Sequence, residues 1–228
     1  AKPIPLPGHM GPVISAAFSP DGTRVVTASA DRTARIFRIT TGPPMKGEKP
    51  VILSGHKEEV TSAAFSPDGN LVVTTSEDKT IRIWPLEGGE PIVLNGHEDG
   101  VGPAAFSPDG NWIVVASGDH TVRIWPVYLK PRQSVVLRDH KDCVDSAAFS
   151  PDGKWILTAS RDKTARVWPV GGGDPIVLDH RGFSGRYFIL SAKFSPDGTR
   201  IVTVGPGSRI WTLQGDSPVF TSTHAIRA

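Results

Sequence analysis

A histidine, a serine and an aspartate recur in the same order four times along this chain. The four sets are His9, Ser29 and Asp31; His56, Ser76 and Asp78; His97, Ser117 and Asp119; and His140, Ser160 and Asp162. These three residue types are those of a serine hydrolase, in which the histidine takes the proton of the serine and the aspartate orients the histidine. Hydrolysis is therefore the first hypothesis to weigh.

The repetition of the sets argues against hydrolysis. An enzyme needs one nucleophile rather than four equivalent ones, and the chain contains no G-x-S-x-G nucleophile elbow. Buried polar groups that fully satisfy one another make the core around them rigid. We therefore interpret the four sets as structural networks and predict no catalytic residue.

The sets lie inside a longer repeat that organises the whole chain. Its most regular part is the pentapeptide FSPDG, whose phenylalanine stands at five positions: Phe18, Phe65, Phe106, Phe149 and Phe194. The steps between these positions are 47, 41, 43 and 45 residues. A period of this length suits one four-stranded unit.

The second repeat illustrates the strands that each unit is expected to form. Val60–Phe65, Leu71–Thr75 and Ile92–Leu94 are short β-prone runs, and Thr80–Trp84 alternates as a strand with two different faces does. Ser66–Gly69 contains the proline, aspartate and glycine of a tight turn. Because short strands are punctuated by turns and no stretch has a helical period, the sequence predicts an all-β fold.

This pattern resembles the WD40 repeat over nearly the whole chain. The matching features are the FSPDG turns, the Ser-x-Asp pairs, the closing Ile-Trp, and the Gly-His pairs Gly8-His9, Gly55-His56 and Gly96-His97. The resemblance implies a β-propeller of WD40-like four-stranded antiparallel blades, with five repeats in this chain. The aspartate of the Trp-Asp dipeptide is missing, because the tryptophans are followed by Pro85, Pro126 and Pro169.

The resemblance also implies a role for each member of the sets. In such blades the aspartate of the turn between strands two and three, the histidine before strand one, the serine on strand two and the tryptophan on strand three form an internal network. The tryptophans of this network are Trp84, Trp125 and Trp168. Phe37 replaces tryptophan in the first repeat, so the network around His9 is expected to be the weaker one.

The chain is predicted to be one propeller domain, residues 1–228, or part of one. The repeats span approximately residues 8–53, 55–94, 96–137, 139–178 and 179–220, and residues 3–7 are predicted to be an extra outer strand. Each of the five repeats already has its own outer strand, so residues 3–7 make a sixth and one outer strand is left over. We favour a fragment or subset of a larger propeller that self-associates in isolation, because an open arc exposes strand edges and apolar faces. A closed five-blade ring and a blade completed by another chain are the alternatives.

The fifth repeat departs from the pattern twice. The loop before its first strand is five residues longer, and it contains Arg181, Phe183, Arg186 and Tyr187. The turn that carries the aspartate is replaced by residues 205–207, Gly-Pro-Gly. We favour a decayed terminal repeat, since terminal repeats are often atypical. The alternative is an enlarged contact loop, because arginine and aromatic residues are enriched at binding hot spots.

The family resemblance places the loops before strand one and the turns between strands two and three on one face, which often binds peptides or proteins. Beside those of the long loop, the charged candidates on this face are Glu59, Glu77, Asp99, Asp145 and Arg161, with Glu58, Glu98 and Asp142 nearby. The acidic arc predicts a protein or peptide partner with a cationic segment.

Composition excludes several other classes. The net charge of +2 does not indicate a nucleic-acid partner. Cys143 is the only cysteine, so neither an internal disulfide nor a cysteine-based zinc site is expected; His120 is interpreted as a solvated turn residue, and no metal or cofactor is predicted. No apolar run suits a membrane helix and residues 1–15 lack a signal-peptide core. A chain with a single cysteine and no membrane helix fits a reducing compartment, so a cytoplasmic location is expected; a secreted protein without disulfides is the alternative.

These observations lead to one main hypothesis and two alternatives. The main hypothesis is a non-enzymatic interaction module. The near-identity of its repeats is similar to that of bacterial WD40 arrays attached to signalling ATPases or kinases, which implies a sensor or regulatory role. The alternatives are a propeller enzyme or small-ligand site in the central channel, and a purely structural self-assembling repeat.

Overall fold

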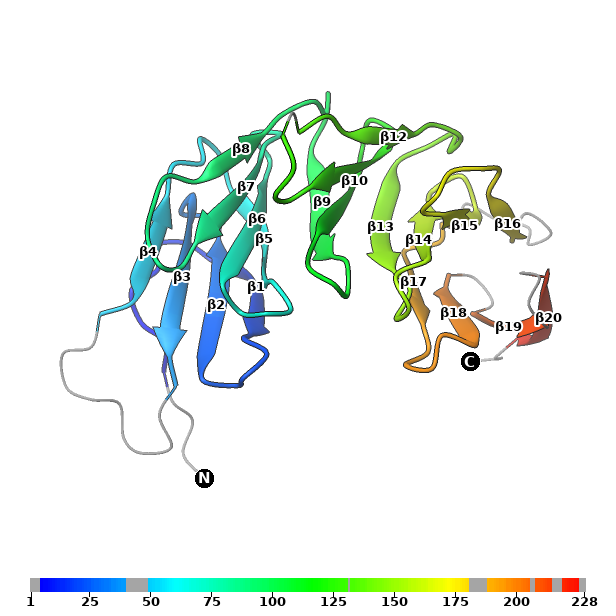
Figure 1. The fold of residues 1–228 in the computed structure, drawn as a ribbon, viewed down its shortest axis with the longest axis horizontal. Coiled ribbons are helices and arrows are strands. Elements are labelled where there is room, and N and C mark those ends of the chain that lie inside the picture. The colour runs from blue at the N-terminus through cyan, green and yellow to red at the C-terminus, as the bar shows by residue number, and fades with distance from the viewer. Residues whose placement is uncertain are drawn as a thin grey trace. The chain divides into compact units, whose positions relative to one another are not determined.

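The computed structural model describes residues 5–39, 49–130, 132–180, 188–205, 208–214 and 219–225, which form β-strands and no helix (Figure 1). The all-β prediction is confirmed. Contacts divide the chain into two compact units, residues 1–104 and 105–228, with the boundary inside β9. Each unit is described by itself.

The strands form five four-stranded sheets, in each of which the strands lie side by side in chain order. The first sheet contains β1 (Val13–Phe18), β2 (Arg24–Ser29), β3 (Thr33–Arg38) and β4 (Val51–Ser54). The second sheet contains β5 (Val60–Phe65), β6 (Leu71–Ser76), β7 (Ile81–Pro85) and β8 (Ile92–Leu94). The registers within both sheets are antiparallel.

The remaining sheets repeat this arrangement. The third contains β9 (Val101–Phe106), β10 (Trp112–Ser117), β11 (Val122–Pro126) and β12 (Val135–Leu137). The fourth contains β13 (Val144–Phe149), β14 (Trp155–Ser160), β15 (Thr164–Pro169) and β16 (Ile176–Asp179). The fifth contains β17 (Ser191–Phe194), β18 (Arg200–Val204), β19 (Arg209–Gln214) and β20 (Val219–Ala225).

The predicted strands of the second repeat agree closely with the observed ones. β5 and β8 have the predicted bounds, β6 is one residue longer, and β7 is shifted by one residue to Ile81–Pro85. The shift arises because the Thr80 N–H donates to the Asp78 carboxylate and so belongs to the turn. Of the predicted extra outer strand, Pro5–Pro7 is not in a strand, and residues 3 and 4 lie outside the described residues. Prolines 5 and 7 lack the N–H that strand pairing needs.

The FSPDG turn is held by its serine and its aspartate. In the second repeat the Ser66 hydroxyl donates to Asp68 at 2.5 Å and accepts the Leu71 N–H at 2.9 Å, while the Gly69 N–H donates to the Ser66 carbonyl at 2.9 Å. Gly69 adopts a φ of 72°, which glycine accepts without strain. These contacts reverse the chain tightly between the first two strands.

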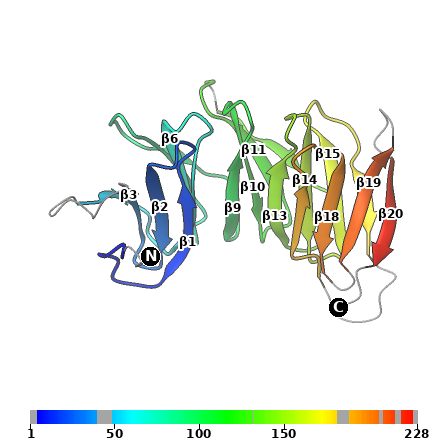
Figure 2. The same ribbon diagram turned by 90° about the horizontal axis from the view of Figure 1, so that it is seen from below.

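Apolar side chains between neighbouring sheets form the core of each unit. In the first unit, Val60 and Phe65 of β5 pack with Val26 and Ile36 of the first sheet. In the second unit, Leu157 of β14 packs in one cluster with Ile201 and Trp211 of the fifth sheet. Figure 2 shows β14 and the strands of the fifth sheet in a view turned by 90°. Burial on both faces explains why the second strands are almost continuously apolar.

Candidate functional site

The second repeat shows how the predicted network is built. His56 precedes β5, Thr74 lies on β6, Asp78 lies in the turn between β6 and β7, and Trp84 lies on β7. His56 Nδ1 is 3.0 Å from Asp78 Oδ2, and His56 Nε2 is 2.8 Å from Thr74 Oγ1. The Trp84 indole N–H donates to the same threonine oxygen at 2.8 Å. Four side chains, from one loop, one turn and two strands, are therefore joined in one series of hydrogen bonds.

The direction of each hydrogen bond follows from the carboxylate at its end. A carboxylate only accepts, so His56 Nδ1 carries the ring proton and Nε2 accepts the Thr74 hydroxyl. The threonine oxygen in turn accepts the Trp84 N–H, so each of these four side chains has a hydrogen-bond partner inside the network. Burial lowers the pKa of His56, although the bond to Asp78 opposes this shift, which agrees with a neutral ring.

Asp78 anchors the network. Its carboxylate accepts four donors: His56 Nδ1 at 3.0 Å, the Lys57 N–H at 2.8 Å, the Thr80 N–H at 3.0 Å and the Thr80 hydroxyl at 2.6 Å. Burial alone would raise the pKa of Asp78, but these hydrogen bonds lower it to about 2. The aspartate is therefore a fixed anion that ties the loop before β5 to the turn after β6.

The serine was expected to belong to the side-chain network, but its hydrogen bonds go to backbone groups. The Ser76 hydroxyl donates to the Glu58 carbonyl at 3.2 Å and accepts the Asp78 N–H at 3.1 Å. Ser29 and Ser160 make the same two bonds in their repeats. The hydroxyl between histidine and tryptophan belongs instead to a threonine two residues earlier, which the sequence analysis did not single out.

The fourth repeat has the same complete network. His140 is 2.8 Å from Asp162 and 2.7 Å from Thr158, and the Trp168 N–H donates to Thr158 at 3.0 Å. In the first repeat His9 keeps its bonds to Asp31 and Thr27, at 2.8 and 2.7 Å, but Phe37 offers no N–H. The third repeat has Val115 at the threonine position.

The fifth repeat retains the threonine but lacks the aspartate. His180 is 1% exposed and 2.9 Å from Thr203, which also accepts the Trp211 N–H at 3.0 Å. His180 Nδ1 has no hydrogen-bond partner among the described residues. Burial, reinforced by Arg209 and opposed by Asp179, lowers the pKa of His180 to about 4. The fifth blade therefore requires this ring to stay neutral.

The stability of the fifth blade is expected to depend on pH. An unfolded histidine titrates near 6.5, whereas folded His180 titrates at about 4, so the unfolded state binds the proton first as the pH falls. The contribution of neutral His180 is complete above pH 6.5 and is lost as the pH falls towards 4. We expect hydrogen-exchange protection factors of β17–β19 to fall at least about 10-fold over this window.

The fourth blade provides the internal control for this measurement. The protection factors of β13–β15 should change less, because His140 Nδ1 there donates a hydrogen bond to Asp162. A His180→Gln variant should lose the pH dependence in the fifth blade. Equal pH dependence of both blades in the native chain would contradict the assignment to His180.

The network resembles a catalytic triad in its arrangement, but a substrate could not reach its hydroxyl groups. Thr74 and Thr158, whose hydroxyls stand where a nucleophile would, are 1% and 0% exposed. A catalytic hydroxyl has to reach its substrate, whereas these groups are enclosed between strands. What the arrangement does is tie one loop to one turn at the same end of the first, second and fourth sheets.

The repeat pattern is that of a known family. The sequence pattern described as "WD40: WD domain, G-beta repeat" matches residues 3–38, 47–85, 89–126 and 131–169, more than half of the chain. The chain belongs to the WD40 repeat family. No curated protein matches it in sequence. The fifth blade lies beyond the matched residues but has the strand order of a WD40 blade.

WD40 repeats generally mediate protein–protein interaction or scaffolding, and two of the predicted partner residues, Glu59 and Glu77, lie in the loop and the turn that the second-repeat network ties together. Glu59 and Glu77 are both exposed, and the Glu77 N–H donates to the Glu59 carbonyl at 3.0 Å. The two glutamates therefore stand side by side. Asp99 is also exposed, and its carboxylate accepts the Gly100 N–H at 2.7 Å.

Two other predicted partner residues contact each other. Arg161 Nε is 3.1 Å from both oxygens of Asp145, and its Nη2 is 3.0 Å from one of them. Asp145 lies in the register irregularity between Val144 and Ser146, which turns it towards Arg161. This pair is partly neutralised within the WD40 blade. Arg181, Phe183, Arg186 and Tyr187 lie outside the described residues.

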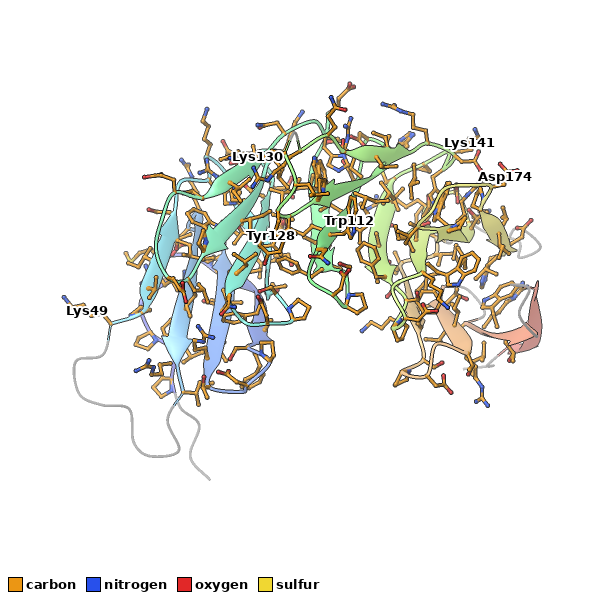
Figure 3. All side chains as sticks on the ribbon, viewed as in Figure 1. Lys49, Trp112, Tyr128, Lys130, Lys141 and Asp174 are labelled. Atoms are coloured by element: carbon orange, nitrogen blue, oxygen red, sulfur yellow. The ribbon has the colours of Figure 1, made fainter. Side chains whose placement is uncertain are left out.

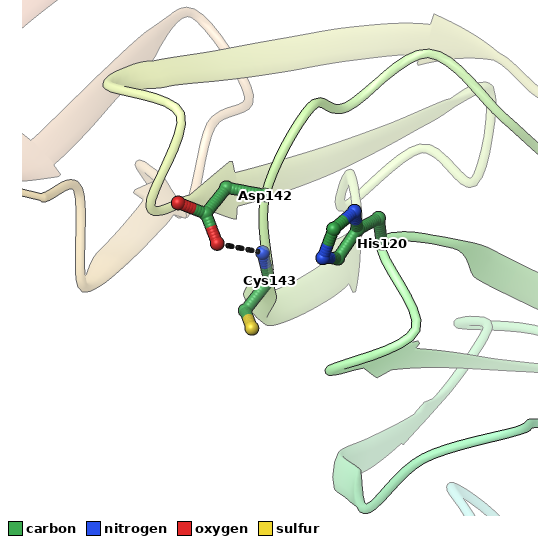
Figure 4. Close-up of side chains that lie close together, drawn as sticks. All are labelled: His120, Asp142 and Cys143. Atoms are coloured by element: carbon green, nitrogen blue, oxygen red, sulfur yellow. Dashed lines mark hydrogen bonds between the residues drawn. The ribbon is translucent and has the colours of Figure 1, made fainter.

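Among the described residues, one cluster of possible metal ligands is present, and the sequence did not predict it. His120 in the β10–β11 turn and Asp142 and Cys143 in the loop before β13 place their imidazole, carboxylate and thiol atoms within 4.8 Å of one another (Figure 4). His120 precedes Asp142 and Cys143 by 22 and 23 residues, yet the fold brings the β10–β11 turn beside the loop before β13. Burial raises the pKa of the Cys143 thiol, which disfavours a nucleophilic role.

Proposed function

We propose that this WD40 chain is a non-enzymatic scaffold whose loop face binds a protein or peptide partner through a cationic segment of that partner. The observation that carries the proposal is the acidic group of the first unit, defined as Glu58, Glu59, Glu77, Glu98 and Asp99, all of which are exposed. Two cations lie among them, Lys57 and Lys79, so the acidic charge is in excess.

The loops that carry the acidic group are fixed in place. Glu58 and Glu59 are held through Ser76, which donates to the Glu58 carbonyl, and through the Glu77 N–H. Lys79 donates its ammonium to the Glu98 carbonyl at 2.7 Å and so ties the second-repeat turn to the next loop. A preorganised charged surface loses less conformational entropy on binding, which supports its use for recognition.

Three finer features belong to the same proposal. The module acts as the sensor or regulatory part of a larger bacterial signalling protein, a role supported by its resemblance to bacterial WD40 arrays. It works in the cytoplasm, a location supported by the free thiol of Cys143, which persists in a reducing compartment. No helix in the described ranges is long and apolar enough to cross a membrane.

Self-association is the third feature, with a second copy of the chain as the occupant of an uncovered blade face. Val13 and Phe18 of β1 are 51% and 69% exposed, whereas their equivalents Val60 and Phe65 in β5 are 0% and 9% exposed. The first sheet covers the β5 residues. Another sheet of the same kind would therefore fit β1, and Val202 and Val204 on β18 are exposed at 36% and 46% to serve as that surface.

Charge reversal tests the proposed binding face. A labelled peptide rich in lysine and arginine is titrated in fluorescence anisotropy against the native chain and a Glu59→Lys/Glu77→Lys variant. The variant is expected to bind about 10-fold more weakly or worse, because like charges then meet the peptide. The oligomeric state of each protein is recorded first by light scattering, so that a face covered by self-association is recognised.

The matched control is Glu87→Lys/Glu90→Lys, which changes the same charge at the opposite end of the second sheet. Glu87 and Glu90 are exposed in the loop between β7 and β8. This control should bind within about 2-fold of the native chain apart from general charge effects. Equal weakening by both variants would show attraction to net charge alone and would refute the proposed face.

A further inference from the structure

The strongest unassigned feature of the molecule is the cluster of His120, Asp142 and Cys143. We propose that these three side chains bind a single borderline-soft divalent transition-metal ion, with Zn²⁺ as the expected ion. The proposal reverses the prediction from the sequence, which expected no cysteine-based zinc site in a chain with one cysteine. A mixed nitrogen, sulfur and oxygen donor set with an open fourth position is one that zinc accepts.

The donor atoms are close enough for one ion. They lie within 4.8 Å of one another. Tetrahedral zinc with bonds of about 2.0–2.3 Å separates its ligand atoms by about 3.3–3.7 Å. The side chains therefore need to approach by roughly 1 Å, which rotation of the exposed His120 ring can supply.

The backbone that carries the ligands is held on both sides. The Ser160 hydroxyl donates to the Asp142 carbonyl at 3.1 Å, and the Arg161 N–H donates to the Cys143 carbonyl at 2.9 Å. The Cys143 N–H donates to Asp142 Oδ1 at 2.7 Å, as the dashed line in Figure 4 shows, and this bond holds the carboxylate against the loop backbone. Lys141, the residue before Asp142 in this loop, is labelled in Figure 3. A site on anchored backbone is better preorganised for an ion than one on mobile loops.

The other repeats show that the cluster is not a general property of this face. Arg32, Lys79 and Lys163 occupy the turn position of His120, with φ values of 68°, 67° and 70° against 67° for His120. Where Cys143 stands, the second and third repeats have Glu59 and Gly100. Lys79 donates its ammonium to the backbone of the following loop, at the Glu98 carbonyl. His120 has an imidazole at the corresponding turn position, beside a thiol and a carboxylate, so a metal cation can supply the positive charge there.

One nearby charge works against a bound cation. The Arg161 guanidinium interacts electrostatically with both Cys143 and Asp142. Its charge is directed to Asp145, to which it donates at 3.0–3.1 Å, so most of the opposing field is neutralised at its source. Binding of zinc also displaces the thiol proton, which adds an anion to the site.

The test is direct metal titration of the full chain. Co²⁺ serves as the spectroscopic probe, in a phosphine reductant that keeps Cys143 reduced, and Zn²⁺ affinity is obtained by displacing it. We expect one equivalent per chain, a thiolate-to-cobalt charge-transfer band, and a Kd for Zn²⁺ on the order of 1 μM or tighter. A rise in Tm with added Zn²⁺ is expected to accompany binding.

The variants are chosen so that they fold. His120→Lys introduces the residue type that the second and fourth repeats have at this turn position with nearly the same φ. Cys143→Ser keeps a side chain of similar size. Each is expected to weaken Zn²⁺ binding at least about 100-fold. Cys143→Ser should abolish the thiolate-to-cobalt band, and His120→Lys should lower its intensity. Asp99→Asn, at the equivalent of Asp142 in the third repeat, is the matched control and should bind as the native chain does.

The outcomes divide cleanly. Loss of binding in both ligand variants, with the control unchanged and all far-ultraviolet circular dichroism spectra alike, supports the site. Absence of the charge-transfer band, equal binding by native and variant chains, or a stoichiometry of half an ion per chain would overturn it. The last result would mean an ion bridging two chains.

Discussion

Replacing Asp78 with alanine is expected to lower the free energy of unfolding by about 3–4 kcal/mol. The side chain is 5% exposed and accepts four hydrogen bonds, from His56, the Lys57 N–H and both donors of Thr80. Alanine removes the anion but leaves these donors in place, and the buried donors then lack acceptors. Urea denaturation followed by circular dichroism measures the change.

Asparagine separates the contribution of charge from that of shape. Its oxygen can still accept the Thr80 donors, but its amide group would face His56 Nδ1 and the Lys57 N–H, which are donors themselves. Asp78→Asn is therefore expected to cost about 2–3 kcal/mol. The neighbouring Glu77→Ala, at an exposed position, is the control and should stay within about 0.5 kcal/mol of the native chain.

Acid provides a second measure of the same group. The pKa of Asp78 lies below its ordinary value, at about 2, so its contribution is complete above the unfolded pKa and is lost as the pH falls through about 4 towards 2. Asp78→Asn should show a shallower loss of stability across that window. An unchanged acid profile in this variant would mean that another carboxylate dominates acid unfolding.

Repetition in the sequence made the frame of each blade predictable. The turns of FSPDG and the alternating run before Trp84 located the strands to within one residue in the second repeat, because tight turns restrict where a strand can end. The pairing of His56 with Asp78 also followed, since both recur at a fixed distance from those turns. What recurs in sequence and lies near a turn was therefore recoverable.

The hydroxyl inside the network was not recoverable by the same argument. Thr74 and Ser76 lie on the same strand two residues apart, so their side chains point to the same face and both have hydroxyls. Only three-dimensional contacts show that Thr74 meets the histidine while Ser76 bonds to backbone. Sequence spacing on one strand could not distinguish these roles.

Side-chain contacts within one blade and between successive blades were equally hidden. Arg161 and Asp145 were both assigned to a partner, but a register irregularity turns Asp145 towards Arg161. His120 and Cys143 belong to different repeats, and neither has the regular ligand spacing that marks a metal site in sequence. Residues that meet across a blade boundary need the fold before they can be combined into a site.

The buried hydroxyl leads to the last expected result. Thr158→Val should lower the free energy of unfolding by about 2–3 kcal/mol. Thr158 is 0% exposed, donates to His140 Nε2 and accepts the Trp168 N–H, so valine leaves two buried polar groups without a partner. Valine has the same shape as threonine, so no cavity contributes to the loss.

The third repeat supplies the reverse experiment, because it already has Val115 at this position, 0% exposed. Val115→Thr introduces the hydroxyl that the second and fourth repeats use and is expected to raise the free energy of unfolding by about 0.5–1 kcal/mol. Both variants are measured by urea denaturation under identical conditions. If Thr158→Val cost as little as an ordinary surface substitution, or if Val115→Thr were strongly destabilising, the threonine would not be the link that joins histidine to tryptophan. Opposite signs in the two repeats would instead establish that one hydroxyl in a blade, outside the apparent triad, completes the network that ties the loop to the turn.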